Sequence, residues 1–165
     1  MDQIEDCGEN ELHTFFMNEA IKEAELGIAG HEGGPFGCVV VKDGKIVGRG
    51  HNQVIRLQDA TCHGEMQAIR DAARNLHTFN LYGCVLYTTA EPCPMCLGAV
   101  LWSNISEVYY GCDVSDTEKI GFRDDRFYRY INGEDRRILV RRQISRRDCL
   151  RVFERYNSDD KRTLY

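Results

Sequence analysis

Long apolar runs are absent from this sequence of 165 residues. The two longest, Cys84–Tyr87 and Leu97–Trp102, fall far short of the ~20 apolar residues that a membrane-spanning helix needs. Internal repeats, low-complexity segments and a Pro/Ser-rich linker are also missing. These absences exclude membrane-spanning, repeat and disordered proteins. They predict a single domain over residues 1–165, with a flexible tail at 1–10 and a C-terminal tail at 157–165.

A signal-peptide pattern is also lacking, because the N-terminus is acidic. We therefore expect a cytoplasmic protein. Eight cysteines could suggest a disulfide scaffold, but in a reducing compartment clustered cysteines more often bind metal or take part in catalysis. Four cysteines outside any motif are expected to be small buried hydrophobes or bystanders: Cys7, Cys38, Cys84 and Cys149.

Charge is unevenly distributed along the chain. The net charge is −5, which gives no general attraction to nucleic acid. Met1–Pro35 nevertheless holds nine acidic residues and one lysine, whereas Arg123–Arg155 holds eleven arginines and six acidic residues. A solvated basic face or an oligomer contact with the acidic segment is the preferred interpretation, and an RNA-binding surface is the alternative.

Apolar periodicity predicts alternating helices and strands. Leu12, Phe16, Ala20, Ala24 and Ile28 recur at every fourth position, which is typical of an amphipathic helix. The expected elements are a helix over His13–Ala29, a hairpin of Phe36–Val41 and Lys45–Gly50, a helix from His63, a strand at Cys84–Thr89, a helix over Pro94–Trp102, a strand at Glu107–Gly111, an edge strand at Arg136–Ile144 and a last helix capped by Ser145. This order predicts one mixed α/β sheet with helices on both faces.

Two short motifs carry the chemistry. His63-Gly64-Glu65 precedes Pro92-Cys93-Pro94-Met95-Cys96, and both motifs open predicted helices. Each motif alone is weak, because an isolated Cys-x-x-Cys also occurs in redox pairs and zinc ribbons. Together they match the His-x-Glu…Pro-Cys-x-x-Cys signature of zinc deaminases.

The spacing of these residues suits a catalytic zinc ion. Cys93 and Cys96 are three residues apart, so a helix places both sulfurs on one face. The positive end of the helix dipole favours thiolates, the form that binds metal. With His63 as third ligand, one tetrahedral position stays open for water. Glu65 is then placed to carry protons between that water, the ring and the departing ammonia.

Two other interpretations of the motif remain open. In a closed structural zinc site, Cys62 or Cys112 would supply the fourth ligand. In a redox pair, Cys93 and Cys96 would cycle between thiols and a disulfide, and nothing in that chemistry requires His63 or Glu65. A zinc-stabilised partner domain without activity is a related alternative, and it does not require Glu65.

At these residues the chain resembles the cytidine deaminase-like superfamily, in its branch acting on nucleobases and tRNA adenosine. Four segments carry the resemblance in order and spacing: Gly33–Gly37, Asn52, Thr61–Glu65 and Glu91–Ala99. It implies a three-layer αβα sandwich with a five-stranded mixed sheet, a dimer or higher oligomer, one Zn²⁺ per chain, and hydrolytic release of ammonia from a ring carbon.

Within that branch the chain is most similar to bacterial guanine deaminases, through Gly34-Pro35-Phe36-Gly37 and Gly121–Asp125. This resemblance implies five substrate-binding residues: Phe36, Asn52, Trp102, Asp124 and Tyr165. Each has a structural alternative: core packing for Phe36 and Trp102, a turn for Asn52, a helix cap for Asp124 and terminal disorder for Tyr165.

The predicted function is zinc-dependent conversion of guanine to xanthine and ammonia by a cytoplasmic homodimer. The C-terminal tail is expected to close the pocket of its own subunit or of a neighbour. Gly64 and the stretch Gly48–Asn52 look like fungal-type cytosine deaminase instead. Cytosine, another amino-heterocycle or a nucleoside is therefore the alternative substrate, and tRNA adenosine is the alternative of another class.

Overall fold

The computed structural model describes residues 3–164. The chain divides into two compact units, residues 1–128 and residues 129–165, and each is described by itself. The first unit contains the sheet, most of the helices and both predicted motifs. The single deaminase domain predicted over the whole chain stays a prediction for the second unit.

The first unit is built around a sheet of four strands among the described residues: β1 (Gly37–Lys42), β2 (Lys45–His51), β3 (Cys84–Ala90) and β4 (Glu107–Cys112). Their order is β2-β1-β3-β4, with β1 antiparallel to both neighbours and β3 parallel to β4. Asp43 and Gly44 turn the β1–β2 hairpin with positive φ values of 49° and 70°. The predicted hairpin is confirmed.

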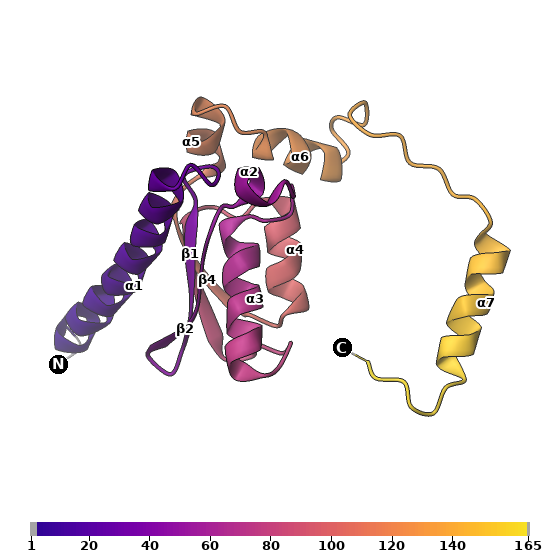
Figure 1. Ribbon diagram of the computed structural model, residues 1–165, viewed down its shortest axis with the longest axis horizontal. Coiled ribbons are helices and arrows are strands. Elements are labelled where there is room, and N and C mark those ends of the chain that lie inside the picture. Colours follow the sequence, from indigo (N-terminus) through magenta and orange to yellow (C-terminus); the bar gives the residue numbers. More distant parts are fainter. Residues whose placement is uncertain (1–2, 165) are drawn as a thin grey trace. The chain divides into compact units, whose positions relative to one another are not determined.

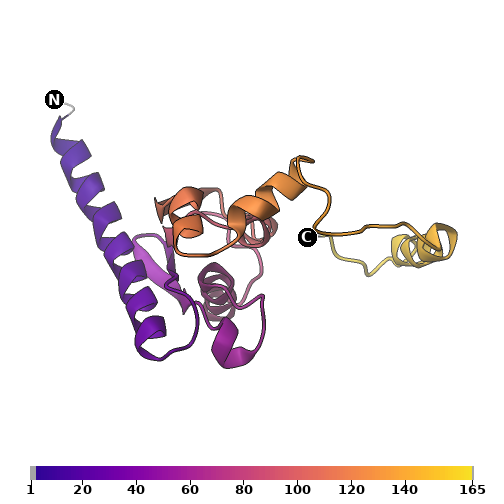
Figure 2. The same ribbon diagram turned by 90° about the horizontal axis from the view of Figure 1, so that it is seen from above.

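Helices cover both faces of this sheet, so the three-layer prediction is confirmed (Figure 1 and Figure 2). Helix α1 (Gln3–Ala29) lies on one face, and α3 (Gly64–Leu76) and α4 (Pro94–Trp102) lie on the other. Successive side chains of β1 point to opposite faces of the sheet, so the core is divided into two clusters. One cluster is formed by Phe16, Ala20, Val39, Val41 and Tyr87, and the other includes Cys38, Val40, Ala68, Ala72, Leu86 and Val100.

Glycine in β2 allows α3 to pack directly onto the strand. A Cβ atom added at Gly50 would lie 2.4 Å from the backbone nitrogen of Ala68. Such a distance is sterically forbidden, so only glycine permits this approach of helix to strand. As a result, the first turn of α3 lies beside the end of β2, where the chain continues into Asn52.

Two expectations about these elements were wrong. Helix α1 begins at Gln3 rather than His13, so it includes most of the segment expected to be a tail. The sheet has four strands rather than five, because residues 136–144 form no strand. A strand forms only where a neighbour pairs with its backbone groups, and the local sequence does not show whether such a neighbour is present.

The remaining helices are short. They are α2 (Val54–Leu57), α5 (Val114–Lys119), α6 (Asp124–Ile131) and α7 (Arg146–Asn157). Ser145 immediately precedes α7 but has a left-handed backbone and makes no side-chain capping bond, so that predicted cap was wrong. Within the second unit, the Tyr156 hydroxyl donates to the Thr163 carbonyl at 2.5 Å. Over residues 3–164, no helix is both long and apolar enough to cross a membrane.

Candidate active site

Two helix N-termini meet at the predicted motif. His63 is the N-cap residue of α3 and Cys93 is the N-cap residue of α4, where Pro94 occupies the first turn. Side chains at this position usually accept a hydrogen bond from the helix backbone. Neither His63 nor Cys93 does so. Both side chains are therefore available for another partner.

A metal ion fits between these side chains as the partner. The donor atoms of His63, Cys93 and Cys96 all lie within 4.8 Å of one another, and the three side chains are buried or half-buried. The Cys93 sulfur is 3.6 Å from His63 Nδ1. Nitrogen and sulfur ligands of a tetrahedral zinc ion are about 3.6 Å apart, as follows from bond lengths near 2.0 and 2.3 Å. The residues present thus fit one zinc ion in both chemistry and spacing.

Electrostatics at these residues also favour a metal ion. The hydrogen bonds that Cys93 accepts from Cys96 and His63 lower the pKa of Cys93 to about 4. The bond to Cys93 and burial raise the pKa of Cys96, so without metal this thiol keeps its proton. The same pairing with Cys93 raises the pKa of His63. Cys93 is thus already a thiolate that can bind a metal ion, and zinc binding would displace the protons of Cys96 and His63.

The metal group has three ligands rather than four. Among the described residues, neither Cys62 nor Cys112 belongs to it, and Cys112 is exposed. Three protein ligands with an open fourth position are typical of catalytic rather than structural zinc. The side chains therefore do not form a closed structural zinc site. Of the cysteines outside the motif, Cys38 and Cys84 are buried as expected, Cys149 is exposed, and the side chain of Cys7 is not described.

Glu65 lies in the first turn of α3, two residues after His63, and is 5% exposed. Burial is the main reason that its pKa is raised to about 6. The nearby Cys93 raises it further, whereas His63 opposes the shift. A carboxyl group with a pKa close to neutrality exchanges protons readily in both directions. The structure therefore places a buried carboxyl group with a pKa near neutrality beside the metal group.

Phe36 and Asn52 lie side by side at the edge of the site. The backbone N–H of Asn52 donates to the Phe36 carbonyl at 2.9 Å, and the Phe36 carbonyl also lies against Gly64 at the start of α3. The rings of Phe36 and Phe122 pack edge to face, with their centroids 4.7 Å apart. Asn52 is 3% exposed, and its Oδ1 atom accepts from the Val54 N–H.

Asp124 begins α6 and is half-buried close enough to His63 and Cys93 for their charges to act on it. Burial is the main cause that raises its pKa. The sequence prediction missed Tyr128, four residues later on the same helix, whose hydroxyl donates to the Pro92 carbonyl at 2.5 Å. A spacing of four on a helix was the signal available in the sequence, because it places both side chains on one face. Tyr128 thus connects α6 to the residue before Cys93.

Trp102 is not placed at this site. Trp102 is the last residue of α4, about 9 Å along the helix axis from Cys96 at a rise of 1.5 Å per residue. Its side chain is 69% exposed. The structure therefore does not bring Trp102 together with the metal group. Tyr165 lies outside the described residues, so its predicted contact with substrate stays a prediction.

Comparisons with known sequences agree with this geometry. The family model described as "Cytidine and deoxycytidylate deaminase zinc-binding region" matches residues 10–112. A guanine deaminase from Bacillus subtilis is 42% identical over 120 residues, which are 73% of this chain and 77% of that protein. A tRNA-specific adenosine deaminase from Streptococcus pyogenes is 38% identical over 148 residues, which are 88% of this chain and 90% of that protein.

Solved structures show the same two kinds of relative. The guanine deaminase structure from Bacillus subtilis superposes with a TM-score of 0.87 and 36% identity, covering 93% of this chain and 98% of that chain. A structure from a study of tRNA:A34 deaminases superposes with a TM-score of 0.58 and 39% identity, covering 61% of this chain and 72% of that chain.

Proposed function

Because the chain belongs to the cytidine and deoxycytidylate deaminase zinc-binding family, we propose that it deaminates free guanine to xanthine and ammonia. It is a hydrolytic deaminase with a zinc-binding domain, which follows from the family match over residues 10–112 and from the His63, Cys93 and Cys96 group. Guanine is the more specific part of the proposal and needs its own support.

Similarity to the Bacillus subtilis guanine deaminase structure supports the choice of guanine. That structure superposes over 93% of this chain, whereas the tRNA:A34 deaminase structure covers 61%. A coverage of 93% includes residues beyond 112, where the family model ends. Resemblance to guanine deaminase therefore extends to the region that supplies the proposed base-recognising carboxylate.

The proposed mechanism uses His63, Cys93 and Cys96 as metal ligands and Glu65 as the proton carrier. A zinc ion bound there would supply Lewis-acid activation of the attacking water. The Glu65 carboxylate would take one proton from the attacking water and deliver it to a ring nitrogen. It would then carry the second proton of that water to the amino group, which leaves as ammonia. Burial keeps Glu65 out of bulk water, so the proton stays within the site.

Four side chains near the metal group are suited to a purine. Asp124 accepts a hydrogen bond from the ring's amino or N–H edge, and Nδ2 of Asn52 donates to a ring acceptor. Phe36 and Phe122, in contact at 4.7 Å, offer an apolar wall for the base. A site that pairs with polar edges rejects bases that lack them, because its own buried groups would be left unpaired.

A substrate panel tests this proposal. Zinc-loaded protein is incubated with guanine, guanosine, cytosine, isocytosine and an amino-triazine, and ammonia release is measured for each. We expect turnover of guanine with xanthine as product. Turnover of a different base without guanine would contradict the substrate, and a zinc-loaded protein inactive on the whole panel would contradict the nucleobase proposal.

A tRNA adenosine deaminase is the second candidate, favoured by the 38% identity to the Streptococcus pyogenes relative over 88% of the chain. The eleven arginines within Arg123–Arg155 would then contact phosphates. Binding of that kind weakens steeply as salt rises. Gel-shift titration with tRNA at 50 and about 200 mM salt separates the candidates, because a guanine deaminase needs no such complex.

We propose a cytoplasmic homodimer in which residues 157–165, including Tyr165, close the pocket of one or the other subunit. Light scattering of the purified protein tests the dimer. Removal of residues 157–165 tests the tail, and we expect a raised KM for guanine with zinc content unchanged.

A further inference from the structure

A cluster of polar side chains lies beside Asn52 and has no part in the mechanism above. We call it the Glu32 cluster, and its members are Glu23, Glu32, His51, Gln53 and Arg56. We propose that Glu32 is a positioning residue, which fixes Asn52 for substrate binding by holding the two residues on either side of it. This inference rests on the proposed role of Asn52 in the site.

One carboxylate oxygen of Glu32 contacts both neighbours of Asn52. Oε2 lies 3.0 Å from Nε2 of His51 and accepts from Nε2 of Gln53 at 2.5 Å. Residues 51 and 53 therefore both lie against this carboxylate, whereas the Asn52 side chain accepts from the Val54 N–H. A bond to each neighbour therefore restrains the backbone of Asn52 while leaving its own amide group to the site.

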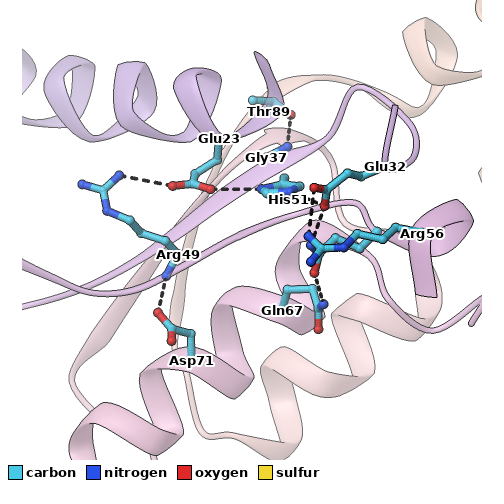
Figure 3. Close-up of polar contacts among 10 residues, drawn as sticks. Glu23, Glu32, Gly37, Arg49, His51, Arg56, Gln67, Asp71 and Thr89 are labelled. Carbon is cyan, nitrogen blue, oxygen red and sulfur yellow. Dashed lines mark hydrogen bonds and ion pairs between the residues drawn. The ribbon is translucent and has the colours of Figure 1, made fainter. Parts of the chain in front are cut away.

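His51 is held from both ends. Figure 3 shows its ring between two carboxylates, with Nδ1 3.2 Å from Glu23 Oε2 and Nε2 3.0 Å from Glu32 Oε2. Glu23 lies on α1 and is 8% exposed. Nη1 of Arg49, which lies on β2, is 3.6 Å from the Oε1 atom of Glu23. The ring thus connects α1 to the segment that carries Asn52.

Glu32 is in turn fixed to the chain on both sides. Its backbone N–H donates to the Gly27 carbonyl at 3.0 Å, and its own carbonyl accepts from the N–H groups of Ile55 and Arg56, both at 3.0 Å. The Arg56 guanidinium donates to Glu32 Oε1 at 2.9 Å. These bonds hold the turn after α1 against the segment from Asn52 to α2.

The next residue explains how closely the two segments approach. A Cβ atom added at Gly33 would lie 2.0 Å from Oδ1 of Asn52, so any larger residue would displace the Asn52 amide. The turn that Glu32 holds in place is therefore in contact with Asn52 itself. A shift of this turn would alter the position of the amide.

Gln53 extends the cluster toward the metal group. Its Oε1 atom accepts from Nε2 of Gln67 at 2.5 Å, and the backbone N–H of Gln67 donates to the His63 carbonyl at 3.0 Å. Glu32 is thus linked through Gln53 to the first turn of α3. The cluster therefore fixes the position of Asn52 relative to the helix that carries His63 and Glu65.

The contacts predict a selective effect on substrate binding. In Glu32→Ala, both neighbours of Asn52 lose a carboxylate acceptor, so we expect KM for guanine to rise about tenfold and kcat to change less than about threefold. Zinc should remain at one per chain. Glu32→Gln retains one amide acceptor, so its KM should lie between those of the wild type and Glu32→Ala.

Glu19→Ala is the matched control. Glu19 lies on α1 and accepts from Lys22 at 2.6 Å and Arg49 at 2.7 Å, but it contacts neither neighbour of Asn52. We expect its kinetics to stay within about twofold of the wild type, because the contacts that hold Asn52 remain in place. Equal KM values for Glu32→Ala and Glu19→Ala would overturn the proposal.

A double-mutant cycle separates positioning from a general structural effect. In an Asn52→Ala background, Glu32→Ala should add less than about twofold to KM, because the group it positions is gone. The full tenfold effect in that background would overturn the proposal. If Asn52→Ala alone leaves KM unchanged, the role of Asn52 in binding is wrong.

Hydrogen exchange keeps the test independent of the substrate. In Glu32→Ala, the amides of residues 52–56 should exchange at least about tenfold faster than in the wild type, and Glu19→Ala should not change them. Unchanged exchange would contradict the positioning role even if guanine were the wrong substrate. An active wild type with normal Glu32→Ala kinetics refutes the inference alone, whereas a wild type inactive on guanine with faster exchange in Glu32→Ala refutes only the proposed function.

Discussion

The metal group and the surrounding substrate contacts are built in different ways. His63, Glu65, Cys93 and Cys96 come from the first turns of two helices and lie within short sequence motifs. Phe36, Asn52 and Asp124 come from two loops and the start of α6, and each depends on neighbours distant in sequence. The first region is fixed by local geometry, whereas the second is fixed by how separate segments pack. The predictions below test this contrast.

Loss of a metal ligand should have the largest effect. In His63→Ala, one of three protein donors is removed, and we expect both zinc content and ammonia release to fall to background. Metal analysis of the purified variant gives the first result and the guanine assay the second. A variant that still binds one zinc per chain and retains activity would contradict the assignment of the ligands.

Glu65→Gln should separate catalysis from metal binding. The amide cannot carry the proton, so kcat should fall by about 10²–10⁴-fold. Zinc content and melting temperature should remain close to the wild type, because the ligands are untouched. Wild-type turnover in this variant would mean that another group moves the proton. It would also favour a zinc domain in which Glu65 has no chemical role.

Changes among the substrate contacts should affect KM more than kcat. In Asp124→Asn, the carboxylate that would accept from the purine is replaced by an amide, and we expect KM for guanine to rise about 10–100-fold, corresponding to about 1.4–2.8 kcal/mol. Tyr128→Phe removes the hydrogen bond to Pro92 and serves as a milder comparison on the same helix. Steady-state kinetics with zinc-loaded protein measure both, and an unchanged KM in Asp124→Asn would remove this residue from the site.

Trp102 should behave as a position outside the site. Its side chain is 69% exposed at the far end of α4, so Trp102→Ala should change kcat and KM by less than about twofold. The same assay on the same preparation provides the measurement. A rise in KM comparable to that of Asp124→Asn would restore Trp102 to the substrate contacts and show that the active assembly differs from the single chain.

The smallest expected effect concerns stability in acid. Hydrogen bonds from Gln53 and His51, together with Arg56, lower the pKa of Glu32 from 4.5 to about 2. A carboxylate whose pKa is lower in the folded state stabilises the fold above pH 4.5 and loses that contribution as pH falls toward 2. The melting-temperature difference between the wild type and Glu32→Gln should therefore be constant above pH 5 and shrink below pH 4.5. A difference independent of pH would show that the Glu32 charge contributes nothing.

Much of the fold followed from sequence, and the failures share one cause. The β1–β2 hairpin was predicted because Lys42-Asp43-Gly44 specifies a turn locally. Helices α3 and α4 were predicted because Pro94 and apolar spacing act within one segment. The strand at residues 136–144 was predicted wrongly, since a strand also needs a pairing partner, which the local sequence does not provide.

The same distinction applies to the site. The sequence alone predicted the metal ligands and Glu65, because donor type and spacing at a helix start are local properties. Packing between distant segments placed Asn52 against Phe36, brought Asp124 near His63, and left Trp102 exposed at the end of α4. It also revealed the Glu32 cluster, whose residues follow no motif. Their contacts arise because the turn after α1 and the end of β2 pack together, and packing between distant segments is not encoded in any single stretch of sequence.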